Sequence, residues 1–400
     1  MQEIHEFDAL KSLSSQVLSV LQVHALREPL LPNVRTLSLW LTPKTEEFTP
    51  FIPLFLSTRT TTIHLIFSGR NHRNVTIASV ITAFPTLCPN LHKIQLTRLP
   101  RDPTITAAVS ELVLNTNQNN LRFFYVDSTL TEEACKVIYK HPGLCGLQTI
   151  IDRPIALPTM VLPNLTDIDI EYTHGHDWLQ GFRGASLGKL TSVTITSETD
   201  PIGDFLGAFK SVALTTSIPA TLSSFSFQTE HSWIPSYRSL LPFTQLTYLI
   251  IESSCQLGCS STIDDDTIIN LARAMPKLEE LRLGGPPCET PGGVTVKGLA
   301  AVAYYCLHLR DLFVHFQVAS LDPPEIPDLT FTDEFAIPRA ACPMYYLQAG
   351  DTRVPEGSTL MVALTLLRIF PHLELVSSSD TGWEEVSRAL YHSKQLACFK

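Results

Sequence analysis

The segment from Leu246 to Val314 decides the fold, and it reads LTYLIIESSCQLGCSSTIDDDTIINLARAMPKLEELRLGGPPCETPGGVTVKGLAAVAYYCLHLRDLFV. One template occurs in it twice and begins a third time: Leu-x-x-Leu-x-Leu or a close variant, a polar loop, and an amphipathic helix. The copies start at Leu246, Leu278 and Leu309, which are 32 and 31 positions apart. A unit of this length that recurs is typical of repeat architectures. The sequence therefore predicts a stack of similar units.

One unit reads as a strand followed by a helix. Leu281 and Leu283 alternate with polar residues, as in a strand with one buried face. Asp264 to Asp266 supply side-chain oxygens for the start of a helix and complement its positive end. Pro276 stops that helix and commits the chain to extended geometry. A single unit cannot cover its apolar face, but stacked units can.

The same residues resemble a known family. The spacing from Leu246 to Cys255, then Ile263 to Ala272, then Met275 to Leu278, is similar to the cysteine-containing leucine-rich repeats of F-box/leucine-rich-repeat proteins. Val294 to Leu309 and Leu130 to Cys135 are further matches. In that family an N-terminal F-box recruits the ubiquitin machinery through a Skp1-type adaptor, and the repeats hold the substrate. The resemblance thus implies a protein partner.

The degenerate template runs along nearly the whole chain, with a mean spacing of about 28 residues, inside the range of leucine-rich repeats. The first inward positions are expected at Val34, Thr60, Leu91, Leu121, Leu147, Leu165, Leu190, Leu222, Leu246, Leu278, Leu309, Met344 and Leu373, with a truncated further strand at Leu396. Helices are expected at 49–56, 75–84, 104–115, 131–140, 201–214, 264–274, 296–305, 359–369 and 383–391. The 18-residue unit from Leu147 to Leu165 has room only for an extended segment or a short 3₁₀ turn.

Geometry predicts the fold class, an α/β leucine-rich-repeat solenoid. Parallel strands stack about 4.8 Å apart, whereas helices with side chains are about 10 Å wide. The helical side must fan out, which gives a curved horseshoe with parallel strands on the concave face and helices on the convex face. We expect a capping helix within residues 1–30, from Ile4 to Leu26, and about 13 irregular repeats in residues 31–400.

The N-terminal segment leaves two functional alternatives open. Only 33 residues precede Val34, and they lack the Leu-Pro-x-Glu-like motif that opens an F-box. One alternative is substrate recognition in an F-box-like ubiquitin ligase, with an F-box encoded upstream or lost. The other is a free-standing leucine-rich-repeat scaffold or inhibitor with no link to ubiquitin transfer.

Composition excludes several classes of function. The chain has 29 Lys and Arg against 39 Asp and Glu, and a net charge of −10 without a basic stripe argues against nucleic acid. No apolar run reaches the roughly 18 residues of a membrane span, and no secretory signal opens the chain. The nine cysteines form no even disulfide pattern. Several, such as Cys88, Cys306 and Cys342, sit at core-like positions, which predicts reduced thiols in a cytoplasmic or nuclear protein.

The concave face is the expected binding site. Aromatic and charged residues fall between the inward positions of the strands, and Tyr, Phe and Arg dominate protein interfaces. The candidate partner-binding residues are Phe123, Tyr125, Asp167, Asp169, Glu171, Tyr248, Glu252, Arg282, Phe313, His315 and Tyr346. They can also be ordinary strand-surface residues, because aromatic side chains favour strands.

Long loops rich in Pro and Gly form a second candidate site. They span 253–262, 285–294, 317–327 and 350–357, and all leave the same end of consecutive strands. They should therefore cluster on one rim, where binding loops concentrate. Loops also simply tolerate insertion, so both interpretations stay open.

Motifs that carry chemistry are weak. Gly184 to Thr191 is one residue short of a phosphate loop and precedes a strand. His174, His176 and Asp177 lack a further cluster to complete a metal site, and Cys255 and Cys259 lack a second pair. No catalytic triad is placed by a local motif. We therefore expect a protein-interaction module without enzymatic activity, cofactor or metal.

Overall fold

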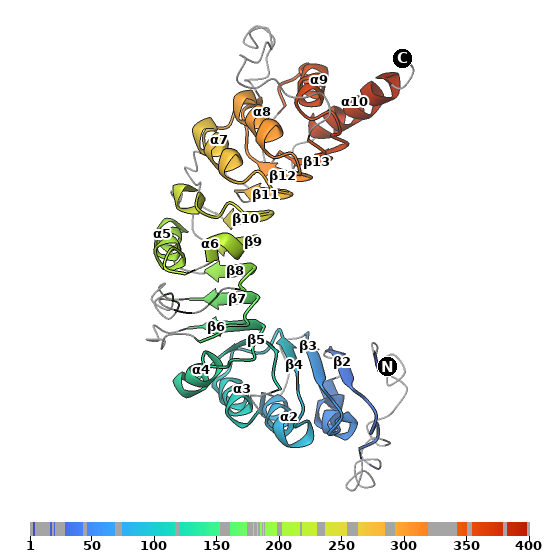
Figure 1. Cartoon of the computed structure of the whole chain (residues 1–400). Helices are drawn as coiled ribbons and strands as arrows, with labels where there is room; N and C mark the ends of the chain where they lie inside the picture. The colour runs from blue at the N-terminus through green and yellow to red at the C-terminus, as the bar shows by residue number, and fades with distance from the viewer. Residues whose placement is uncertain are drawn as a thin grey trace. The chain divides into compact units, whose positions relative to one another are not determined.

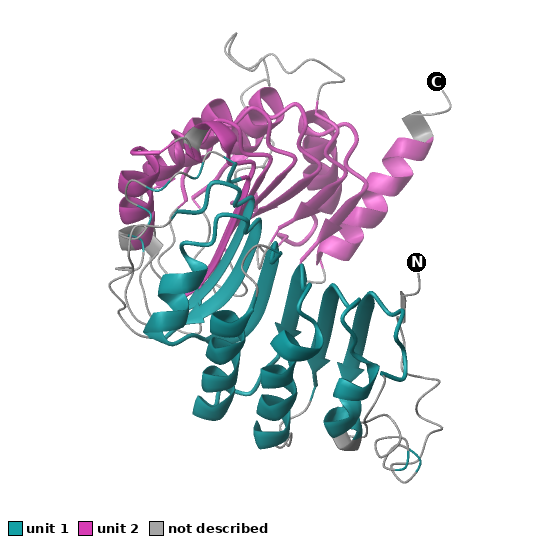
Figure 2. Cartoon of the chain, turned by 60° about the horizontal axis from the view of Figure 1, so that its bottom comes forward, with its two compact units in different colours: residues 1–172, 177–190 teal, residues 173–176, 191–400 magenta. Residues whose placement is uncertain are grey.

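The computed structural model places the chain in two compact units (Figure 2). Unit 1 contains residues 1–172 and 177–190, and unit 2 contains residues 173–176 and 191–400. The expected boundary near residue 30 stays a prediction. The structure describes residues 3–4, 17, 20, 29–42, 46–68, 74–116, 120–152, 161–173, 179, 182, 185, 187, 189–197, 202–216, 218–229, 237–253, 263–284, 293–318, 342–349, 354–378 and 382–397.

Unit 1 is a parallel sheet with helices on one face. Its strands are β1 (Glu3–Ile4), β2 (Thr36–Leu41), β3 (Thr62–Phe67), β4 (Lys93–Thr97), β5 (Phe123–Thr129), β6 (Gly146–Ile151) and β7 (Asp167–Tyr172). Each pairs in parallel with the next strand in chain order. Between them run the 3₁₀ helix η2 (Glu46–Phe55) and the helices α2 (Asn74–Leu87), α3 (Pro103–Asn115) and α4 (Glu132–Ile138). The three α-helices lie side by side (Figure 1).

Unit 2 repeats this arrangement. Its strands are β8 (Ser192–Ser197), β9 (Ser224–Thr229), β10 (Tyr248–Ser253), β11 (Glu280–Leu283), β12 (Asp311–Val314), β13 (Tyr346–Gln348) and β14 (Leu375–Ser377), again parallel and in chain order. Its helical segments are α5 (Ile202–Ala213), α6 (Ile218–Thr221), η4 (Tyr237–Leu240), α7 (Asp265–Ala274), α8 (Val296–Tyr305), α9 (Thr359–Ile369) and α10 (Gly382–Ala397). The expected α/β fold, with parallel strands alternating with helices, is confirmed.

The strand register follows the template. Every strand from β2 to β14 except β6 begins two residues after the expected first inward position. That first position closes a tight turn: the Leu165 N–H donates to the Leu162 carbonyl over 3.1 Å, and the Leu278 N–H donates to the Met275 carbonyl over 3.2 Å. Within the strands, buried and partly exposed residues alternate, as in β7. The template leucines therefore anchor both the turn and the core.

The position expected at Leu147 is wrong by three residues. Leu144 is the first inward residue of that unit, since it is fully buried and its N–H bonds to the His141 carbonyl, while Leu147 pairs with Phe124 at the second position. The third position holds the polar Thr149, which hid the pattern. Its buried hydroxyl donates to the Ser128 carbonyl over 3.2 Å. This repeat is therefore 21 residues long, from Leu144 to Leu165, and not 18.

The expected helices lie close to the observed ones, with one difference of type. The helix expected at 49–56 overlaps η2, a 3₁₀ helix that ends at Phe55 and contains Pro50 and Pro53, and neither proline can donate an intrahelical hydrogen bond. The segment around Pro154 and Pro158 lies outside the described residues. Among the described residues, no helix combines the length and apolar character needed to cross a membrane.

Both ends of the chain differ from expectation. Ile4, expected to begin a capping helix, lies in β1 beside Leu37 of β2; residues 17 and 20 are helical, and the rest of that segment lies outside the described residues. Leu396, expected to begin a strand, belongs to α10. This helix packs on α9 and on β14, the last strand.

A serine of α10 covers the edge of β14. The Ser387 hydroxyl accepts from the Val376 N–H over 3.3 Å and donates to the Val376 carbonyl over 2.8 Å. These backbone groups would otherwise remain unpaired at a sheet edge. The outer edge of β14 is therefore covered at Val376.

The core thiols match the sequence interpretation. Cys88, Cys306 and Cys342 are free and buried. Burial raises the pKa of Cys88 and of Cys342 to about 11, and it also raises the pKa of Cys306. Because the thiolate is the reactive form, these cysteines act as packing residues.

Candidate binding faces

Each unit has an open face, which we define as the side of the sheet opposite its helices. In unit 1 the open face carries Lys93, Phe123, Tyr125, Asp127, Gln148, Asp167, Asp169 and Glu171. In unit 2 it carries Tyr248, Glu252, Glu280, Arg282, Asp311, Phe313, His315, Tyr346 and Gln348. All eleven side chains expected to bind a partner lie in these two sets.

The strand register brings several of the expected residues into rows. In unit 1, Tyr125, Gln148 and Asp169 are cross-strand neighbours on β5, β6 and β7. In unit 2, Tyr248, Glu280, Asp311 and Tyr346 form a row across β10 to β13. Lys93 and Gln148 were not among the expected binding residues, and only the corrected register from Leu144 places Gln148 on the open face.

An aromatic pair forms one part of the unit 1 open face. The ring centroids of Phe123 and Tyr125 are 6.0 Å apart at an interplanar angle of 37°. The Lys93 Nζ lies 5.6 Å from the Tyr125 ring centroid, within the range of cation–π attraction. Gly146 on β6 makes room for the tyrosine, because a Cβ there would lie 2.1 Å from the Tyr125 hydroxyl oxygen. Tyr125 therefore lies across the neighbouring strand.

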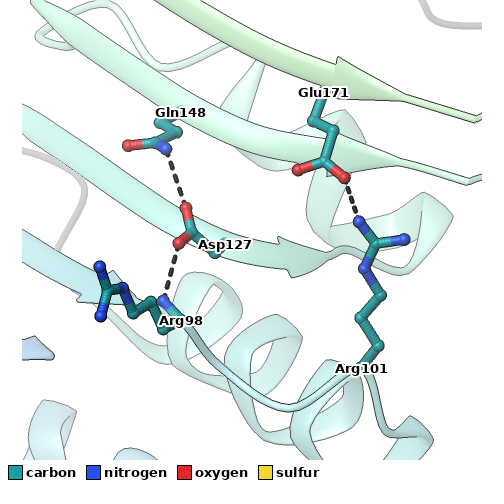
Figure 3. Close-up of polar contacts among 5 residues, drawn as sticks. All are labelled: Arg98, Arg101, Asp127, Gln148 and Glu171. Carbon is teal, nitrogen blue, oxygen red and sulfur yellow. Dashed lines mark hydrogen bonds and ion pairs between the residues drawn. The ribbon is translucent and has the colours of Figure 1, made fainter. Parts of the chain in front are cut away.

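A hydrogen-bonded carboxylate lies beside this pair. Asp127 Oδ2 accepts from the Arg98 backbone N–H over 2.7 Å, and Asp127 Oδ1 accepts from Gln148 Nε2 over 2.8 Å (Figure 3). Arg98 has a φ of 59°, in the left-handed region that a residue with a side chain rarely adopts. The Asp127 carboxylate thus holds an unfavourable turn at the end of β4.

An ion pair spans the unit 1 sheet. Arg101, in the segment between β4 and α3, pairs with Glu171 on β7, 70 residues further along the chain (Figure 3). The Arg101 side chain is 59% exposed and that of Glu171 is 30% exposed. Ion pairs in such wet surroundings contribute little to stability. Arg101 therefore lies over Glu171, but the ion pair holds it there only weakly.

Asp169 is the most perturbed carboxyl group on the unit 1 open face. Burial, followed by the negative charges of Asp127 and Glu171, raises its pKa to about 6. Among the described residues, none donates a hydrogen bond to the Asp169 carboxylate. Its charge thus changes just below neutral pH, and it keeps its full capacity to accept hydrogen bonds.

The unit 2 open face is more self-contained. Arg282 Nε pairs with Glu280 Oε1 on the same strand over 2.5 Å, and the Tyr346 and Ser377 hydroxyls bond across β13 and β14 over 2.7 Å. Burial, followed by the charge of Glu280, raises the pKa of Asp311. Tyr248 remains 41% exposed.

Two expected binding residues of unit 2 are buried. Phe313 is 6% exposed and His315 is 9% exposed, and their rings are 5.5 Å apart at 64°. Gly284 lies against them with a φ of +125°, and a Cβ there would lie 2.9 Å from His315 Cδ2. Strand alternation had placed both side chains on the open face, but it does not report whether other segments cover them.

The expected rim of loops falls largely outside the described residues, and so do His174, His176, Asp177, Cys255, Cys259 and the two glycines of the 184–191 segment, Gly184 and Gly188. The ends of the loops do meet, since Asp264 bridges to Gly293 and Val294 bridges to Phe316. Among the described residues, no group of three or more His, Cys, Asp or Glu is placed to hold a metal ion.

The three consecutive aspartates serve helix starts. Asp264 Oδ1 accepts from the Thr267 N–H over 2.9 Å and caps α7. Asp265 reaches the next helix: it accepts from the Thr295 N–H over 2.7 Å, the Thr295 hydroxyl over 2.6 Å and the Gly298 N–H over 3.0 Å. Helix capping was the expected explanation for these carboxylates, but the sequence did not show that Asp265 caps α8, the helix of the next repeat.

A scan against models of known protein families finds no match to this chain, and a search of curated proteins finds no relative. The binding faces are therefore interpreted from their own chemistry.

Proposed function

We propose that this chain is a leucine-rich-repeat protein that binds another protein through the open faces of its sheets. The row of Tyr125, Gln148 and Asp169 carries the proposal. It places an aromatic ring, an amide and a carboxyl group side by side on a surface that no described helix covers. Aromatic side chains with a few oriented polar groups are typical of protein interfaces.

The strand pattern supports the leucine-rich-repeat assignment. A buried residue lies two positions before each strand from β2 to β14, and each strand pairs in parallel with its neighbours in chain order within its unit. The buried free thiols favour a reducing compartment.

The test compares matched substitutions on the two sides of the molecule. Tyr125→Ser and Tyr248→Ser change the open faces, whereas Val75→Ser and Leu114→Ser change exposed apolar residues on α2 and α3. We expect the open-face variants to lose the proteins that the wild type enriches from its native cell extract, as quantified by mass spectrometry, and the helix variants to keep them. Loss in the helix variants alone would contradict the proposal.

Substrate recognition in an F-box-like ubiquitin ligase is the first setting we propose for this binding. It is motivated by the resemblance of residues 246–314 to the repeats of that family. The alternative setting is a scaffold or inhibitor with no link to ubiquitin transfer. Co-purification of a Skp1-type adaptor with the endogenous full-length protein would favour the first, and its reproducible absence while other partners are retained would favour the second.

A further inference from the structure

We infer that the open face of unit 1 docks an extended, arginine-containing segment of the partner protein, and that a partner guanidinium replaces Arg101 on Glu171 and reaches Asp169. This inference rests on the proposed function and adds the chemistry of the partner.

Charge complementarity is the first argument. The face carries the acidic residues Asp127, Asp167, Asp169 and Glu171, and its strand cation Lys93 lies over the Tyr125 ring. Asp127 is satisfied by Arg98 and Gln148. The remaining negative charge repels phosphate groups and attracts a cationic segment.

The chain itself shows which cation fits. Arg101 already places a guanidinium on Glu171, above the open face (Figure 3). Because the Arg101 side chain is 59% exposed, a partner arginine can exchange with it at little cost. The planar guanidinium fork matches a carboxylate better than the ammonium of lysine does.

Asp169 is the vacant acceptor beside this position. It lies two residues from Glu171 on β7, so both side chains leave the same face of the sheet. No described residue donates to its carboxylate. A second guanidinium N–H, or a backbone N–H of the bound segment, can be accepted there.

The aromatic pair provides a surface for stacking. Phe123 and Tyr125 lie on β5, and the Tyr125 ring extends over Gly146 of the neighbouring strand β6. Guanidinium groups stack on aromatic rings, and the Lys93 Nζ shows that a cation sits on the Tyr125 ring here. On the unit 2 open face, Glu280 is not a vacant acceptor of the kind that Asp169 is, since Arg282 already pairs with it.

Binding of a cation should be linked to protonation. The charged groups that act on Asp169 within unit 1 are Asp127 from β5 and Glu171 from β7, and Tyr125 of β5 is close enough for Asp169 to raise its pKa. Burial and the neighbouring carboxylates raise the pKa of Asp169 to about 6, so a bound guanidinium should lower it. Affinity is then highest above neutral pH and falls as the pH drops through about 6.

The experiment uses the full chain and fluorescent peptides of alternating arginine and serine, with lysine and glutamate versions for comparison. In fluorescence anisotropy we expect Asp169→Asn and Glu171→Gln to weaken binding of the arginine peptide about tenfold each. The control Glu111→Gln removes the same charge from the exposed outer side of α3 and should leave binding unchanged.

Arg101→Gln gives the opposite sign. Because it removes the internal competitor, we expect the arginine peptide to bind about threefold more tightly, a gain below the tenfold that 1.4 kcal/mol represents. Lys140→Gln, which removes the same charge from an exposed site after α4, is the matched control. Equal gains in both variants would show that only net charge matters and would overturn the inference.

A measurement on the wild type removes any dependence on folding of the variants. We expect the arginine peptide to lower the pKa of the Asp169 carboxyl group, followed by carbon NMR titration, from its value of about 6. Absence of binding, equal binding of the glutamate peptide, or an unchanged Asp169 titration would overturn the inference. The proposed function would survive that outcome if the open-face serine variants still lost the native partner.

Discussion

The open faces of the two units solve the same packing problem with opposite consequences for access. In unit 1, Gly146 makes room for the Tyr125 ring, which stays partly exposed beside acidic residues. In unit 2, Gly284 makes room for His315, which is buried together with Phe313. A glycine beside a ring therefore marks a crowded position, and only burial shows whether the ring can meet a partner.

The electrostatics of the two faces differ in the same sense. Glu280 of unit 2 has Arg282 two residues away on its own strand. Asp169 of unit 1 has no described donor, and its neighbours Asp127 and Glu171 are also acidic. Asp169 of unit 1 therefore remains without a described donor, whereas Glu280 of unit 2 is paired within its own strand.

The strongest test of this comparison substitutes the two glycines. Gly284→Ala should lower the free energy of unfolding by about 3 kcal/mol, because alanine must adopt a positive φ and its Cβ meets the buried His315. Gly146→Ala should cost less, about 1 kcal/mol, because the Tyr125 ring can swing into solvent. Chemical denaturation measures both.

A second substitution separates strain from crowding. Tyr125→Ala should recover most of the loss in Gly146→Ala, whereas His315→Ala should not rescue Gly284→Ala, whose backbone remains strained. Equal losses for the two glycine variants would break the comparison between the faces.

Helix capping between two neighbouring repeats of unit 2 gives the next largest effect. Asp265→Ala should lower the free energy of unfolding by about 2 kcal/mol, because three donors of the Thr295 to Gly298 turn lose their acceptor. Asp264→Ala removes only the cap of its own helix and should cost about 1 kcal/mol. Thermal unfolding of the two variants checks the order, and a larger loss for Asp264→Ala would contradict it.

Asp169→Asn should stabilise the protein, in contrast to the other substitutions. The pKa of Asp169 is raised to about 6 in the folded chain, so ionisation opposes folding and stability falls as the pH rises from about 4 through 6. At pH 8 the variant should gain about 1 kcal/mol relative to its difference from the wild type near pH 3, where the wild-type carboxyl group is protonated in the folded chain and mostly protonated in the unfolded chain. Denaturation at the two pH values measures this difference.

The smallest expected effect belongs to the ion pair across unit 1. Glu171→Gln should change the free energy of unfolding by less than about 0.5 kcal/mol, because Arg101 remains well solvated. Urea denaturation at low and high salt gives the measurement. A clearly larger loss would mean that Arg101 is fixed on the face and would sharpen the contrast with Arg282 of unit 2.

The sequence predicted most of the fold because each unit carries its own short-range signals. Leucine spacing located every strand from β2 to β14 except β6, where Thr149 replaced an apolar residue and its hydrogen bond to Ser128 became visible only in the structure. From Leu396 to Phe399 the sequence is apolar and resembles the start of another repeat, but residues up to Ala397 belong to α10, which packs on β14.

The candidate site was predictable only as a set of strand positions. Alternation placed Tyr125 and Asp169 on the open face, but it could not show the bond from Arg98 to Asp127, which joins residues 29 positions apart. The Arg101–Glu171 pair is more distant still. Such contacts depend on side-chain reach across several strands, for which a local pattern carries no signal.

Ser387 forms hydrogen bonds to the last strand, β14, that a further strand would otherwise form. Its single hydroxyl offers Val376 both a donor and an acceptor, which is what an incoming peptide would have to supply to prolong the sheet there. Lengthening of this sheet by another chain would first require α10 to detach. The proposed recognition is therefore directed away from the edge of β14 and toward the side chains that the strands display.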